Sequence, residues 1–198
     1  MNGCSLLNDV LEPVMRGASS SLAAAPYAIA RTLRELSLSA GGELVRAAVR
    51  FDRDGAFARV HEGQGSDDGF AAGLLAEAIE SPRYHKALER LRSPDGAFLF
   101  LIEIGSLPSP DHPNLAELDL VCREKDGAKR TDRYLAVSAG GDRFTIRELN
   151  GNETRIDGTT GGLAGDANGA APGNDELPGA NRTLGEGRRL GIPGHPEP

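Results

Sequence analysis

Apolar residues near the N-terminal end of the chain recur with the period of an α-helix. Between residues 22 and 38, Leu and Ile return every three or four positions with Arg and Glu between them, which predicts an amphipathic helix. Pro26 falls in the first turn of this segment, where a missing backbone N–H costs least. The pair Gly41-Gly42 follows and is expected to end the helix.

The period of the apolar positions then changes to two. Residues 44–51 alternate in the way that strands do, and residues 56–61 are interpreted as a second strand. Asp54-Gly55 lies between them and is a residue pair that tolerates the positive φ of a tight turn. The pattern therefore predicts a β-hairpin over residues 44–61.

A glycine-rich loop and a second helical segment come next. Residues 63–69 form the predicted loop, and Asp67 or Asp68 is placed to cap the helix that follows. Apolar spacing then predicts a helix from Phe70 to about residue 92, interrupted at Pro82. Carboxylates at the helix start would repel a phosphate, and the lysine of a phosphate-binding loop is missing, so we expect no nucleotide site here.

The most hydrophobic run of the chain, residues 98–104, predicts a strand buried on both faces and hence central in the sheet. Four shorter strands are predicted after it, at residues 117–123, 133–138, 143–149 and 153–157. Turn pairs separate these four strands: Asp126-Gly127, Gly140-Gly141 and Asn150-Gly151. Strands joined by such tight turns must be antiparallel.

This order of elements predicts an α+β fold rather than a parallel α/β fold. We expect an antiparallel, largely meander sheet of about six to seven strands, with the N-terminal helix and the central interrupted helix packed on one face. The expected divisions are a poorly structured segment at residues 1–20, the α+β domain at 21–158, and a disordered tail at 159–198. That tail holds 10 Gly and 5 Pro in 40 residues, a composition typical of disorder.

Charge and cysteine content narrow the choice of partners. The formal net charge is −7, which argues against nucleic acid or an anionic membrane surface as a partner. Cys4 and Cys122 are far apart and predict neither a disulfide framework nor a metal site. We find no signal-peptide pattern and no apolar run long enough to span a membrane. The expectations are a cytoplasmic protein with no metal and no cofactor.

The candidate catalytic groups are three carboxylates of the central helix: Asp68 and Glu77, which could share one face of it, and Asp67 nearby. A buried carboxylate with a raised pKa can serve as a general base. An antiparallel sheet wrapped around a helix resembles the hot-dog thioesterase fold, some members of which place a carboxylate there. The resemblance implies acyl-thioester chemistry for these residues, although the His-Gly-Gly loop of that family is missing and Pro82 interrupts the helix.

No catalytic motif is present beyond these carboxylates, so the sequence favours a protein without catalytic activity. The hypothesis is a non-catalytic protein-binding factor, such as an inhibitor, an immunity-type factor, a chaperone or an accessory subunit, acting on a protein partner through its folded surface. Two alternatives stay open. One is a hot-dog-like acyl-thioester hydrolase or binding protein, and the other is a structural subunit with an extended C-terminal arm.

Overall fold

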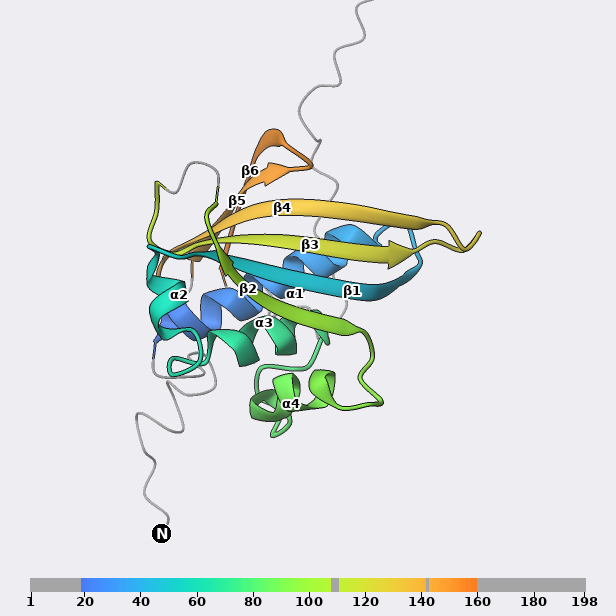
Figure 1. Ribbon diagram of the computed structural model, residues 1–198, viewed down its shortest axis with the longest axis horizontal. Helices are drawn as coiled ribbons and strands as arrows, with labels where there is room; N and C mark the ends of the chain where they lie inside the picture. The colour runs from blue at the N-terminus through green and yellow to red at the C-terminus, as the bar shows by residue number, and fades with distance from the viewer. Residues whose placement is uncertain (1–18, 108–110, 142, 160–198) are drawn as a thin grey trace, which may run out of the picture. The chain divides into compact units, whose positions relative to one another are not determined.

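The computed structural model describes residues 19–107, 111–141 and 143–159 (Figure 1). The segment predicted as poorly structured, 1–20, and the Gly/Pro-rich tail, 159–198, lie almost wholly outside the described residues. Their predicted boundaries therefore stay predictions.

One six-stranded sheet dominates the described part of the chain, with strand order β2-β1-β3-β4-β5-β6. Its strands are β1 (Glu43–Asp52), β2 (Leu99–Gly105), β3 (Leu115–Arg123), β4 (Lys129–Gly140), β5 (Arg143–Leu149) and β6 (Asn152–Thr159). The last four form the predicted meander, and every neighbouring pair is antiparallel except β1 with β2, which is parallel. The α+β class and a mostly antiparallel sheet are thus confirmed.

The helical elements precede and interrupt the sheet in the chain. They are a π-helical turn η2 (Ser20–Ala24), α1 (Ala25–Leu38), α2 (Ala56–Val60), α3 (Ser66–Leu74), a 3-10 turn η3 (Tyr84–Lys86) and α4 (Ala87–Arg92). Pro26 lies at the start of α1, as expected. Gly41 and Gly42 follow the helix with φ of 90° and 101°, a conformation that L side chains rarely adopt.

The predicted hairpin over residues 44–61 is wrong. Gly55 has φ −75° and ψ 167°, so the Asp54-Gly55 pair does not make the tight turn that a hairpin needs. Residues 56–60 form α2 instead and bury Phe57, whose ring stacks on Phe51 at a centroid distance of 5.0 Å. The partners of β1 are β2 and β3, which come from much later in the chain.

The predicted central strand over residues 98–104 is also misplaced. Figure 1 shows β2 at the border of the sheet, and it pairs with β1 alone among the described strands. Of its side chains only Phe100 is buried, and Leu99 and Ile104 are more than half exposed. A continuous apolar run predicts a strand that is buried on both faces in the middle of a sheet. β2 instead ends the order of the described strands and has a neighbouring strand on one side only.

The core lies between the sheet and the helices and consists mainly of aliphatic and alanine side chains, with a cluster of aromatic rings. α1 contacts β1, β3, β4, β5 and β6, and α3 packs against α1. Gly69 and Gly73 of α3 allow this close approach, because a Cβ at Gly73 would lie 2.7 Å from the Cβ of Ala30. The placement of all helices on a single face stays a prediction.

No helix in the described part of the chain is both long and apolar enough to cross a membrane.

Candidate functional site

A histidine and an aspartate meet at the N-terminus of α3. His61 follows α2 directly, and Asp67 lies in the first turn of α3. His61 Nδ1 and Asp67 Oδ1 are 2.7 Å apart, and their side chains are only 14% and 5% exposed. Gly65, with φ of 78°, precedes α3 and turns the chain back so that the two residues face each other. We call this pair the His61–Asp67 dyad.

The core beneath holds the dyad in place. The ring of His61 packs on Phe51 at a centroid distance of 5.3 Å. The hydroxyl of Ser66, the residue before Asp67, donates a hydrogen bond to the carbonyl of Leu22 and fixes the start of α3. Both ends of the short segment between α2 and α3 are therefore anchored, and the imidazole has little freedom to leave the carboxylate.

Burial raises the pKa of Asp67, while the hydrogen bond from His61 and the charge of His61 lower it. A carboxyl group with a raised pKa exchanges a proton more readily near neutral pH than an exposed aspartate does. The Asp67 carboxylate also orients the ring, because a proton on Nδ1 directs the other ring nitrogen, Nε2, to accept. The arrangement can therefore move a proton to or from a bound molecule.

A surface hollow of about 410 Å³ lies beside the dyad and is lined by residues 58–64. His61 is one of its lining residues, and Glu62 and Gln64 add polar groups. His61 of the dyad thus forms part of the wall of an open, mostly polar hollow, which gives a small polar ligand access to this residue.

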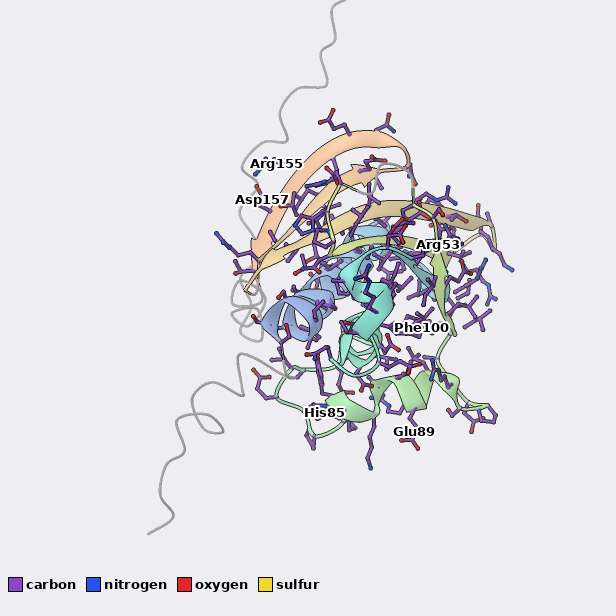
Figure 2. All side chains as sticks on the ribbon, turned by 60° about the vertical axis from the view of Figure 1, so that its left-hand side comes forward. Arg53, His85, Glu89, Phe100, Arg155 and Asp157 are labelled. Atoms are coloured by element: carbon purple, nitrogen blue, oxygen red, sulfur yellow. The ribbon has the colours of Figure 1, made fainter. Side chains whose placement is uncertain are left out.

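Asp68 faces a second hollow. Its carboxylate accepts a hydrogen bond from the Leu88 backbone N–H at 3.4 Å. Burial raises the pKa of Asp68, and the Leu88 N–H and the charge of His85 lower it. The hollow measures about 600 Å³, and Figure 2 labels two of its lining residues, His85 and Glu89, on the segment that faces α3. Asp68 therefore lines this second hollow, whereas the adjacent Asp67 contacts His61 and lines neither hollow.

Glu77 is separate from both. The helix ends at Leu74, and Ala76 has φ of 54°, so Glu77 does not share a helix face with Asp68 as the sequence suggested. Its carboxylate accepts hydrogen bonds from Arg83 at 3.2 Å and from Arg90 at 2.5 Å. The Ser81 hydroxyl, then Arg90 and Arg83, hold the pKa of Glu77 below its usual value. A carboxylate locked in this way is suited to a structural role.

The proposed helix cap is wrong in detail. α3 begins at Ser66 after Gly65, without a side-chain cap, so Asp67 and Asp68 lie inside its first turn and not at the cap position. In that turn they still interact favourably with the helix dipole. The sequence pattern placed residue 61 at the end of a predicted strand, and His61 was not among the candidate residues. The local signal that could have found it is a His and an Asp six residues apart on either side of a glycine-rich loop.

Within residues 19–107, 111–141 and 143–159, no three His, Cys, Asp or Glu side chains are grouped so that they could hold a metal ion. Cys122 is buried in β3, where burial raises the pKa of its thiol.

No family model matches the chain. A similar protein is "Probable L-serine dehydratase, beta chain" from Bacillus subtilis (strain 168), which is 33% identical over 150 residues. The alignment covers 76% of this chain and 62% of that relative, so the chain spans less than two thirds of the relative's length. Because the alignment covers 150 of 198 residues, 48 lie outside it, and it therefore includes most of residues 19–159.

This similarity contradicts the hypothesis of a non-catalytic binding factor, because the relative carries the name of one chain of an enzyme. The two alternatives, a hot-dog-like acyl-thioester protein and a structural subunit with a C-terminal arm, are corrected by the same finding. A chain that forms part of an enzyme need not carry a recognisable motif of its own.

Proposed function

We propose that this chain is a subunit or domain of an enzyme of the L-serine dehydratase type. The observation that carries the proposal is the 33% identity over 150 residues, which extends through most of the described domain. The cytoplasmic location expected from the sequence is retained as part of this proposal, and the absence of a nucleic-acid partner stays a prediction.

The partner in this proposal is a second, different protein chain. The relative is named a beta chain, a term used when an enzyme has chains of more than one kind. This chain also covers only part of that relative. We therefore propose that an assembled active site needs groups from a partner as well as from this domain.

Within the assembly we propose that the His61–Asp67 dyad takes part in proton transfer. Loss of water from a hydroxy amino acid requires removal of the Cα proton and protonation of the departing hydroxyl group. His61 is suited to such a transfer because it lines an open hollow and its Nδ1 is held by Asp67 at 2.7 Å. Asp67 then acts as a positioning residue, which fixes the tautomer and orientation of the ring.

The test starts from the chain in its own assembly. A tagged copy is purified under gentle conditions from its source, and the eluate is assayed for ammonia release from L-serine. We expect release that depends on the tagged chain. With His61→Gln, kcat should fall by about 10²–10⁴-fold, the usual contribution of a general acid or base. Asp67→Asn should lower kcat and shift the pH profile, because the ring loses its orienting carboxylate.

Asp95→Asn is the control, since Asp95 is an exposed residue in the turn before β2 and lies outside both hollows. It should leave kcat and KM unchanged. An assembly that releases no ammonia from L-serine would refute the proposed function. Normal release by His61→Gln and Asp67→Asn would instead refute the role of the dyad and leave the assignment to an enzyme standing.

A further inference from the structure

The edge strand β2 carries the most exposed large apolar side chains of the described domain. Leu99 is 56% exposed and Ile104 53%, and both lie in this one strand. Among the strands that the structure describes, β2 pairs only with β1, so alternate backbone N–H and C=O groups along its outer side have no strand partner. Such an edge is a template for pairing with another strand.

The opposite edge of the sheet shows what a protected edge looks like. β6 carries the charged residues Glu153, Arg155 and Asp157, with an ion pair of 2.9 Å between Arg155 and Asp157. Charged side chains of this kind discourage pairing with another strand. Figure 2 labels Arg155 and Asp157 on this strand. β2 has no comparable protection.

The single charged side chain of β2, that of Glu103, is paired with the neighbouring strand β1. Glu103 accepts hydrogen bonds from Arg50 of β1, at 2.8 Å from one guanidinium nitrogen and 3.2 Å from another. Arg50 also contacts Glu117 of β3. Because Glu103 is already paired with a charge on the neighbouring strand, it does not repel an incoming strand as an unpaired edge charge would.

The sequence of β2 is complementary to itself. In an antiparallel pair related by a two-fold axis near Leu101 or Ile102, Glu103 faces Leu99 or Leu101 of the other copy and never another Glu103. In the same two registers, Ile104 faces Phe98 or Phe100 of the other copy. With the axis at Leu101, the exposed Ile104 faces the partly buried Phe98; with the axis at Ile102 it faces Phe100, whose ring is buried in its own core, so the first register is favoured. Neither register brings like charges together.

We propose that two copies of this chain associate through β2, antiparallel, to form a continuous twelve-stranded sheet, six strands from each copy. The occupant of the free edge is thus a second copy of the same strand. This inference does not depend on the proposed function, since it uses neither the His61–Asp67 dyad nor the two hollows.

Sedimentation equilibrium of the purified full chain over a concentration series tests the association. We expect a dimer for the wild type and a monomer for the double variant Leu99→Lys with Ile104→Lys, because the change removes the two exposed apolar side chains of β2 and because lysine on an edge strand discourages pairing with another strand. Ile156→Lys on β6 is the matched control, since Ile156 is 36% exposed on the other edge and should leave the dimer intact. Circular dichroism establishes that each variant is folded.

A second measurement applies if the lysine variant fails to fold. In a Cys4→Ser background, Leu101→Cys places a thiol in β2 near the proposed axis, and mild oxidation should give a disulfide-linked dimer. The same change at Thr145 of β5 should give none. A monomeric wild type, a dimer that survives the double lysine change, or cross-linking at Thr145→Cys but not at Leu101→Cys would overturn the proposal. A different protein paired with β2 in the native assembly would overturn it as well.

Discussion

At the scale of single residues, the carboxyl of Asp67 is held between two opposing influences. Burial raises its pKa, and the bond and charge of His61 lower it. We therefore expect Asp67 to titrate above the ordinary aspartate value, and the change His61→Gln to raise the pKa further. Between the unfolded pKa of about 3.9 and the raised folded pKa, the contribution of Asp67 to the free energy of unfolding therefore falls as pH rises. Carboxyl ¹³C NMR titration measures the pKa directly.

Asp52 provides the internal comparison in the same spectra. Its carboxylate accepts hydrogen bonds at 2.9 Å from the backbone N–H groups of Leu107 and Asp54, and these two bonds lower its pKa, the Leu107 bond more strongly. Asp52 should titrate below the ordinary value and be unaffected by His61→Gln. A pKa of Asp67 that does not rise when His61 is replaced would contradict the geometry of the dyad.

Replacement of Gly73 should disturb the contact between α1 and α3. A Cβ there would lie 2.7 Å from the Cβ of Ala30 and closer still to the carbonyl of Tyr27. Gly73→Ala should lower the unfolding free energy by about 1–3 kcal/mol, the usual range for overpacking. Gly63→Ala is the control, because a Cβ there meets nothing within 4 Å. Urea unfolding compares the two, and an equal effect of both changes would refute the packing argument.

At the scale of elements, Glu77 ties the segment after α3 to α4. Its carboxylate is buried and contacts Arg83 and Arg90, and the Tyr27 hydroxyl donates to the Glu77 carbonyl at 3.0 Å. Glu77→Gln should cost about 1.5–3 kcal/mol at neutral pH, the range for hydrogen bonds to charged groups, with the lower end expected because both arginines are partly exposed.

The pH dependence separates this effect from a loss of packing. Because the folded pKa of Glu77 is lowered, its contribution is present above the unfolded pKa of about 4.3 and disappears as pH falls through the folded pKa. Wild type and Glu77→Gln should therefore converge in stability in acid. Urea unfolding across this pH range measures the difference, and a gap that persists in acid would show that Glu77 acts by packing.

The elements that local sequence could predict are those whose partners are adjacent in the chain. β3 to β6 were predicted as successive strands because each pair is joined by a turn with its own residue signature. Asn150 and Gly151, for example, both have positive φ in the structure, at 52° and 76°, as the turn type requires. α1 was predicted, as a helix over residues 22–38, for the same kind of reason, since its period and its glycine stop are local.

The features that the sequence did not predict depend on residues far apart in the chain. β1 pairs in parallel with β2, which is about fifty residues away, and no turn signature announces such a pair. Hydrophobicity alone does not distinguish an apolar strand at an edge from one at the centre, so residues 98–104 were placed wrongly. The candidate site was half predicted: Asp67 and Asp68 were named, but His61 enters only when α2 replaces the expected strand and turns the imidazole toward Asp67.

At the scale of the whole molecule, the chain divides after Asn168, with Met1–Asn168 and Gly169–Pro198 as separate units. The alignment to the dehydratase beta chain leaves 48 residues of this chain unmatched. The second unit has only 30 residues, so part of the first unit also lies outside the alignment. Sequence composition predicts that the second unit adds little to the folding of the first, because Gly- and Pro-rich segments bury too little apolar surface to offset ordering.

A chain that ends at Asn168 should therefore keep the Tm of the full chain. A chain that ends at Gly151 should have a lower Tm, because it lacks β6 and exposes the edge of β5. Phe144 and Ile146 of β5 are buried and pair with Gly158 and Ile156 of β6. Differential scanning calorimetry compares the three lengths. A clear fall in Tm on removal of residues 169–198 would show that the second unit stabilises the first. An unchanged Tm with a loss of ammonia release in the native assembly would show instead that the second unit serves the enzyme and not the fold.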